Sequence, residues 1–198
     1  MVINIISVIV AYLICSINPA IIICKLFKGK DIRSLGSKNA GTTNAIRVMG
    51  EFLGSLTFIL DILKSVLAYL IIVFIGNILN SDIDLSVKSL YLISSVIGHC
   101  YPIYYGFKGG KGVATTIASM MIINNEITLV VLIASSLIVL ITRTISAGSV
   151  AGMILLFIMT FVMLPEYIIS VFIISIIVIF KHKENIKRLL NNEEFKIF

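Results

Sequence analysis

The sequence has few charged residues: they make up 13% of its 198 positions, whereas 59% of the chain is hydrophobic. Soluble domains carry roughly a quarter charged residues. The scarcity of charge therefore excludes a soluble globular protein and indicates an integral membrane protein. The longest polar stretch, residues 25–50, is too short for a separate soluble domain, so we expect a single domain over residues 1–198.

Basic residues are missing from the first 24 positions, and cysteine is scarce. A secretory signal peptide begins with a positively charged region, so we expect residues 2–24 to form a membrane span instead. The cysteines Cys15, Cys24 and Cys100 show neither CxxC nor metal-ligand spacing. We therefore assign these cysteines no chemistry.

Three catalytic motifs are also missing. A Walker A loop would require glycine where Tyr105 stands and serine or threonine where Gly112 stands, so nucleotide hydrolysis is not indicated. The HxxxxD motif, which one class of glycerolipid acyltransferases uses, fails at both histidines, where Tyr104 and Lys187 occupy the aspartate position. The chain has no G-x-S-x-G nucleophile elbow either.

The chain does contain seven apolar segments, which predict an all-α, polytopic membrane helix bundle of seven transmembrane helices, two of them short. The segments are residues 2–24, 52–79, 87–107, 113–123, 127–142, 147–164 and 167–180. With the N-terminus outside, 14 of the 16 basic residues fall on one side of the membrane. That side, including the C-terminus, is predicted to be cytoplasmic. Because the charges punctuate membrane spans, we expect lipid head groups and phosphorylated small molecules as partners, and no nucleic acid.

The first polar segment, residues 36–47, contains two glycines whose neighbouring N–H groups can approach an anion. Thr42 or Thr43 can cap a following helix, and Arg47 lies one turn into that helix, where it can bind phosphate through two hydrogen bonds. A polar turn at the membrane surface, followed by a capped helix, is the structural alternative.

The second polar segment, residues 108–112, reads Lys-Gly-Gly-Lys-Gly and precedes an apolar segment. A glycine-rich turn into a helix N-terminus, with two lysines, is suited to holding phosphate. The alternative is a positively charged anchor on the cytoplasmic side, but such an anchor needs no glycines.

The third polar segment, residues 182–188, follows the last apolar segment. On a helix, His182 and Asn185 share a face and can point together at the mouth of the bundle. For Lys183, Lys187 and Arg188, a cationic tail that binds anionic lipid is the simpler interpretation.

Four further polar residues stand in or beside apolar segments. Asp61 and Lys64 are three positions apart in one span, where a charge is costly unless it is paired, so an ion pair is expected. His99 can form a hydrogen bond between helices. Arg143, near Ser146, either marks the cytoplasmic side or joins the anion site.

Together the three polar segments resemble motifs of the PlsY family of bacterial acyl-phosphate:glycerol-3-phosphate acyltransferases. The first matches the family pattern GSxNxGxTN–R, the second matches KGGKGVAT, and the third matches HxENIxRLL. Gly98-His99-x-Tyr101-Pro102 agrees with the family as well. The resemblance covers essentially the whole chain.

The resemblance implies that an acyl group passes from acyl phosphate to glycerol 3-phosphate, giving lysophosphatidic acid in phospholipid synthesis. This reaction needs no metal ion and no redox cofactor, so none is expected. It implies a multi-pass protein of the bacterial inner membrane, a cytoplasmic active site and functional coupling to the enzyme that makes acyl phosphate. The catalytic residues would be Ser37, Lys108, Ser146, His182 and Asn185. The residues binding substrate phosphate would be Asn39, Gly41, Thr43, Asn44, Arg47, Gly109, Gly110, Lys111, Gly112, Arg143, Glu184 and Arg188.

The main alternative function is a small carrier of anions or organophosphates. A carrier needs polar residues that continue to the other face of the membrane, and here only Asp61, Lys64 and His99 lie at depth. The chain shows no internal repeat of the kind many transporters contain. A purely structural membrane protein would not need three polar segments on one face, two of them rich in glycine.

Overall fold

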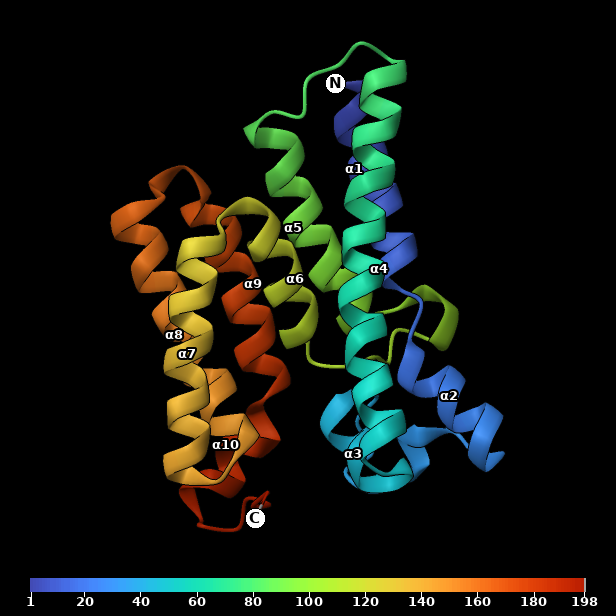
Figure 1. Cartoon of the computed structure of the whole chain (residues 1–198), viewed down its shortest axis with the longest axis vertical. Helices are drawn as coiled ribbons and strands as arrows, with labels where there is room; N and C mark the ends of the chain where they lie inside the picture. Colours follow the sequence, from blue (N-terminus) through green and yellow to red (C-terminus); the bar gives the residue numbers. More distant parts are fainter. Residues whose placement is uncertain (198) are drawn as a thin grey trace. The chain divides into compact units, whose positions relative to one another are not determined.

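The computed structural model describes residues 1–197, and every regular element among them is a helix (Figure 1). The predicted all-α class is therefore confirmed. Contacts divide the chain into two compact units, Met1–Ser119 and Met120–Phe198.

Each apolar segment predicted from the sequence contains a helix. Within the described chain, four helical stretches are long and apolar enough to cross a membrane: Val2–Lys28, Glu51–Ile78, Asn125–Thr142 and Ile145–Met163. A fifth results if Pro165–Lys181 and Lys183–Leu190, which are bent by 60°, form one broken span. Four or five spans confirm a polytopic membrane protein, and seven spans remain a prediction.

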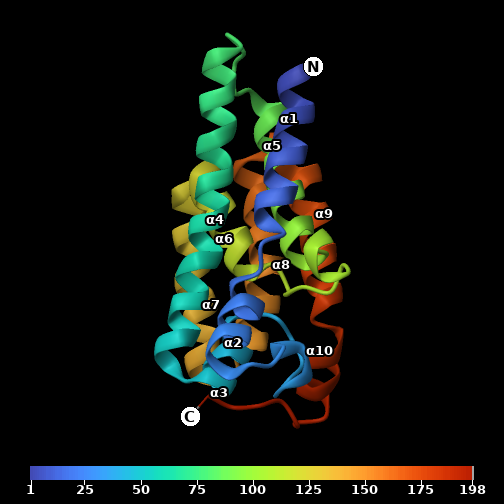
Figure 2. The same cartoon turned by 90° about the vertical axis from the view of Figure 1, so that its right-hand side faces the viewer.

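The first unit contains α1 (Val2–Cys15), α2 (Pro19–Lys28), η1 (Ile32–Ser34), α3 (Thr42–Met49), α4 (Glu51–Ile78), α5 (Leu85–Cys100), η2 (Ile103–Tyr105) and the start of α6 (Val113–Ile123). Helix α1 packs against both α4 and α5 (Figures 1 and 2). Glycine allows this approach, because a Cβ at Gly98 would lie 2.5 Å from the carbonyl oxygen of Tyr12.

The predicted first segment, residues 2–24, is not one helix but breaks between α1 and α2. Asn18 causes the break: its Oδ1 accepts a hydrogen bond from the Ile21 N–H at 3.0 Å and caps α2, which then opens with Pro19. The Asn18 Nδ2 also donates to the carbonyl oxygen of Ala40 at 3.1 Å. The break in the first span is thus bonded to the first polar segment.

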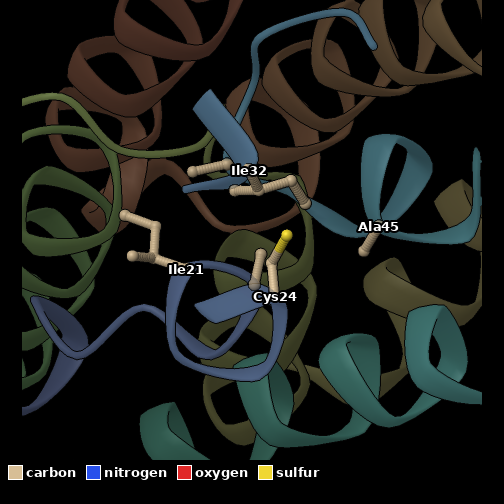
Figure 3. Packing of buried hydrophobic residues seen from close by; sticks show 6 residues of the cluster. Ile21, Cys24, Ile32 and Ala45 are labelled. Atoms are coloured by element: carbon tan, nitrogen blue, oxygen red, sulfur yellow. The ribbon is translucent and has the colours of Figure 1, made fainter. Parts of the chain in front are cut away.

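A small apolar cluster packs against the first polar segment and includes two of its residues (Figure 3). Its buried members are Ala20, Ile21, Cys24, Ile32, Ala40 and Ala45. They come from α2, η1, α3 and, for Ala40, the loop before α3, so burial of their side chains holds these short elements and the loop together. Helix α3 also packs closely on α4, since a Cβ at Gly54 would overlap Ile46.

The second unit contains α7 (Asn125–Thr142), α8 (Ile145–Met163), η3 (Pro165–Tyr167), α9 (Ile168–Lys181) and α10 (Lys183–Leu190). Helices α7 and α8 lie side by side (Figure 1). Two glycines of α8 make this possible: a Cβ at Gly148 would lie 2.7 Å from the Ser135 carbonyl oxygen, and one at Gly152 would overlap the Ser135 hydroxyl. Helices α9 and α10 both contact α8.

Candidate active site

The second polar segment, Lys108–Gly112, folds back over the C-terminal end of α5. The Gly109 N–H donates to the carbonyl oxygen of Cys100 at 3.3 Å, and the Gly110 N–H donates to that of His99 at 3.1 Å. These bonds satisfy carbonyl groups that the end of a helix leaves without partners. A Cβ at Gly109 would overlap the His99 carbonyl oxygen, so the close approach requires glycine.

Gly110 is the point where the two polar segments of the first unit meet. A Cβ there would overlap Nε2 of His99 on one side and lie 3.0 Å from the Ala40 carbonyl oxygen on the other. Two residues later Gly112 has a φ of +90°, and α6 begins at Val113. The predicted glycine-rich turn into a helix N-terminus is thus present, and this geometry favours anions.

Asn44 holds the first polar segment in shape. Its Oδ1 accepts a hydrogen bond from the Ser37 N–H at 2.8 Å, and its Nδ2 donates to the carbonyl oxygens of Leu35 and Asn39, both at 3.0 Å. The residue is only 1% exposed. The side-chain amide of Asn44, predicted to bind phosphate, therefore binds the backbone of the first polar segment and of Leu35, which precedes it.

Helix α3 begins at Thr42 with Gly41 as its N-cap and without a side-chain capping bond, so the predicted capping by Thr42 or Thr43 is wrong. Arg47 lies on α3, as predicted. The other predicted residues of the first unit differ in burial: Ser37, Thr43, Arg47 and Lys108 are exposed, Asn39, Gly109 and Lys111 are half-buried, and Gly41, Gly110 and Gly112 are buried.

Arg33, one of the 14 basic residues predicted to lie on the cytoplasmic side, holds the second polar segment in place. Its Nη1 donates to the carbonyl oxygens of Tyr105 at 2.6 Å and Lys108 at 3.2 Å. Its Nε and Nη2 donate to the Asp31 carboxylate, with a shortest distance of 2.7 Å. This side-chain bond from Arg33 holds the pKa of the Asp31 carboxyl below its usual value. Arg33 therefore links η1 to the turn that carries Lys108.

Replacing Arg33 by glutamine is expected to loosen this turn and to speed trypsin cleavage after Lys108 about tenfold. Hydrogen bonds from a charged donor are worth roughly 1.5–3 kcal/mol each, and cleavage follows the population of the open loop. The rates are measured by mass spectrometry of timed digests in detergent. Cleavage after Lys28, outside the clamped turn, is the internal control, and equal acceleration at both lysines would contradict the assignment.

Asp61, Lys64 and His99 form a buried triad beside Gly110 of the second polar segment. Lys64 Nζ is 2.8 Å from Asp61 Oδ1, 2.9 Å from His99 Nδ1 and 2.7 Å from the Ile17 carbonyl oxygen. Lys64 forms an ion pair with Asp61, and Asp61 Oδ1 also lies 3.3 Å from His99 Nδ1. An ammonium group can only donate, so the contact between Lys64 Nζ and His99 Nδ1 is a hydrogen bond donated by Lys64. Nδ1 of His99 therefore accepts, which places the ring proton on Nε2, the atom beside Gly110. The predicted ion pair and the predicted bond of His99 between helices are both confirmed.

In the second unit, three predicted residues donate to one carboxylate, that of Glu194. Ser146 Oγ and Asn185 Nδ2 donate to its Oε1 at 3.0 and 2.6 Å, and Arg188 Nε donates to its Oε2 at 2.7 Å. Burial raises the pKa of the Glu194 carboxyl, but the hydrogen bonds from these three residues outweigh burial and hold the pKa below its usual value. Glu194 is therefore a carboxylate at neutral pH.

His182 stands at the bend between α9 and α10, where its side chain is buried. Nδ1 lies 2.8 Å from the Val178 carbonyl oxygen, a group that can only accept. In the neutral ring the proton is therefore on Nδ1, and Nε2 carries the lone pair. Glu184 is exposed on α10, and Arg143, also exposed, ends α7 in the left-handed conformation with φ 59°.

Comparisons with known proteins agree over nearly the whole chain. The family model described as glycerol-3-phosphate acyltransferase matches residues 5–192. The glycerol-3-phosphate acyltransferase of Clostridioides difficile strain 630 is 42% identical over 194 residues, which are 98% of this chain and 95% of the relative. That of Finegoldia magna is 40% identical, over 96% of this chain and 93% of the relative.

Solved structures agree as well. The crystal structure of PlsY, an integral membrane glycerol 3-phosphate acyltransferase, in its glycerol 3-phosphate form is similar with a TM-score of 0.88 at 35% identity, over 98% of this chain and 96% of that one. Its lysophosphatidic acid form has a TM-score of 0.84, also at 35% identity, over 98% and 95% of the two chains. The chain belongs to the glycerol-3-phosphate acyltransferase family.

Proposed function

We propose that this protein transfers the acyl group of acyl phosphate to a hydroxyl of glycerol 3-phosphate, giving lysophosphatidic acid and inorganic phosphate. Membership of the family supports glycerol 3-phosphate as the acceptor. The observation that carries the proposal is the meeting of the two polar segments at Gly110, in front of the α6 N-terminus. A glycine-rich turn in front of a helix N-terminus favours anions, so this arrangement suits substrates that carry phosphate.

The proposed reaction is a direct attack of the glycerol hydroxyl oxygen on the acyl carbonyl carbon. The new C–O bond forms, the bond to the phosphate oxygen breaks, and the phosphate leaves with the electron pair. Six residues are proposed to orient substrate phosphates and to stabilise developing charge. They are Ser37, Arg47 and Lys108 in the first unit, and Ser146, His182 and Asn185 in the second. Because acyl phosphate is already activated, a covalent enzyme intermediate is not required.

The hydroxyl proton passes either to a substrate phosphate or to His182 Nε2, the nitrogen that carries the lone pair. An alanine at His182 separates these routes. A turnover number equal to that of the wild type, with both substrates saturating, would assign the proton to a substrate phosphate.

We also propose that the chain crosses the bacterial inner membrane seven times, with its N-terminus outside and its active site cytoplasmic. The distribution of basic residues supports this orientation, because 14 of 16 lie on one side in that threading. A single cysteine introduced at Lys196, in a variant whose native cysteines are replaced, should react with a membrane-impermeant maleimide only after the cells are opened.

The decisive experiment mixes the purified protein with glycerol 3-phosphate and acyl phosphate, and identifies the product by mass spectrometry. Lysophosphatidic acid and phosphate should appear in equal amounts. Acyl-CoA and acyl-carrier protein serve as alternative donors, and efficient use of either would contradict the proposed donor. Uptake of glycerol 3-phosphate into protein-containing vesicles without acylation would instead support the carrier alternative.

We also propose functional coupling to the enzyme that produces acyl phosphate, because this donor is labile.

Replacing Gly110 by alanine is expected to lower kcat/KM about tenfold. The added Cβ overlaps His99 Nε2, so the second polar segment must shift, and misplaced reacting groups are costly. The control is Gly106→Ala: at φ +64° it strains the backbone too, but no atom outside its neighbours lies within 4 Å of the new Cβ. Equal losses in the two variants would show that backbone strain is responsible, rather than contact with His99.

A further inference from the structure

The C-terminal segment of the second unit places a carboxylate among residues assigned to the reaction. Ser146 lies at the start of α8, Asn185 and Arg188 lie on α10, and Glu194 follows α10. Although these residues come from separate parts of the unit, all three donate to the Glu194 carboxylate. The Glu194 side chain is only 8% exposed, whereas that of Arg188 is 29% exposed.

The chain after α10 is held so that Glu194 must enter this position. The Glu193 N–H donates to the Arg188 carbonyl oxygen at 2.8 Å, which ends the helix. Beyond Glu194, the Arg188 guanidinium lies 5.6 Å from the centre of the Phe195 ring, and the Ile197 N–H donates to the Arg143 carbonyl oxygen at 2.9 Å. The segment is thus fixed on both sides of the carboxylate.

We propose that Glu194 is a positioning residue of the acyltransferase, which fixes the Ser146 hydroxyl and the Asn185 amide in the orientation that meets the substrate. This inference rests on the proposed function. A serine hydroxyl has a single proton, and that of Ser146 forms the hydrogen bond to Glu194. The Ser146 side chain is therefore held in one rotamer. The amide of Asn185 is likewise fixed, because only its NH₂ group can donate to a carboxylate at 2.6 Å.

The negative charge and the two oxygens of Glu194 explain why a carboxylate, rather than a neutral amide, is needed here. Glu194 accepts from three donors at once, and bonds to an ionised acceptor are about twice as strong as neutral ones. Glutamine has the same shape but only one oxygen. If that oxygen accepts from Ser146 and Asn185, its NH₂ group faces the Arg188 Nε–H, and two donors meet. The Glu194→Gln variant therefore cannot satisfy all three partners.

A competing interpretation makes the opposite prediction. If the Glu194 carboxylate merely occupied the place of a substrate phosphate, the C-terminal segment would act as an internal inhibitor. Removing the carboxylate would then lower KM for one phosphate-bearing substrate without lowering kcat. A positioning residue must instead lower kcat when it is changed, because its partners become misoriented in the transition state.

The test measures kcat and KM for both substrates in Glu194→Gln, Glu194→Asp and Glu193→Gln. We expect Glu194→Gln to lower kcat/KM about 10- to 100-fold, mainly through kcat. The loss of one hydrogen bond to a charged group corresponds to a change of about this size. Glu194→Asp keeps the charge and should recover part of the loss. Glu193→Gln changes the exposed neighbouring acid and should behave like the wild type.

A double-mutant cycle separates positioning from a general effect on folding. In a background that carries both Ser146→Ala and Asn185→Ala, Glu194→Gln should cost less than about threefold, because the residues through which it acts are gone. An equal cost in both backgrounds overturns the proposal. So does a lowered KM with unchanged kcat, or wild-type kinetics in Glu194→Gln. Wild-type protein that forms no lysophosphatidic acid would refute the proposed function itself, and this role with it.

Discussion

Replacing Lys108 by alanine is expected to lower kcat/KM about 30- to 1000-fold. Removing one charged donor from a site where negative charge develops costs roughly 2–4 kcal/mol of transition-state stabilisation, and each 1.36 kcal/mol corresponds to a factor of ten. The turn that carries Lys108 is also fixed in advance, because Arg33 binds the Lys108 carbonyl oxygen. The backbone from which the Lys108 side chain extends therefore need not be ordered during the reaction. Initial rates, with acyl phosphate and glycerol 3-phosphate varied in turn, measure the loss.

Two further variants define what the Lys108 result means. Lys108→Arg keeps the charge and should retain more activity than Lys108→Ala. Lys28→Ala removes an exposed lysine at the end of α2, outside all three polar segments, and is expected to remain within about twofold of the wild type. Wild-type kinetics in Lys108→Ala would contradict the placement of this lysine at the reacting groups.

The sequence predicted helices best where an apolar segment is flanked by polar residues. The segment 113–123 coincides with α6, because Gly112 and a polar Asn-Asn pair bound it. Prediction failed where the apolar run continues through a break. The segment 87–107 was expected to be one span, yet α5 ends at Cys100, since Pro102 cannot continue the helical hydrogen bonds. Hydropathy alone does not register such a break.

The candidate site shows a similar division. The glycine-rich turn and the ion pair of Asp61 with Lys64 follow from local spacing, so the sequence could indicate them. Arg33 and Glu194 could not be found in this way. Their partners lie 72 positions away in the case of Tyr105 and 48 in the case of Ser146, and no periodic pattern connects them. Such long-range hydrogen bonds become visible only when the fold brings the segments together.

Replacing Lys64 by methionine is expected to destabilise the protein by about 3–5 kcal/mol, the cost of leaving one partner of a buried ion pair alone. The Asp61 side chain is 2% exposed and loses its nearest cation, and the Ile17 carbonyl oxygen and His99 Nδ1 lose a donor. For a chain of this length the unfolding midpoint should fall by about 6–20 °C. Thermal unfolding in detergent can be followed with a thiol-reactive dye, because Cys15, Cys24 and Cys100 are buried and form no disulfide bond.

The double variant Asp61→Asn with Lys64→Met tests whether charge pairing is the cause. With both charges removed, no ion is left buried without a partner. At least half of the decrease in the unfolding midpoint caused by Lys64→Met should therefore be recovered. Lys88→Met, which removes a lysine outside the triad, is the control and should shift the midpoint little. A double variant no more stable than Lys64→Met would contradict the ion-pair explanation. If the double variant recovers stability but its kcat/KM is lower than that of the wild type, the triad also fixes the second polar segment. It would do so through His99, whose Nε2 lies beside Gly110.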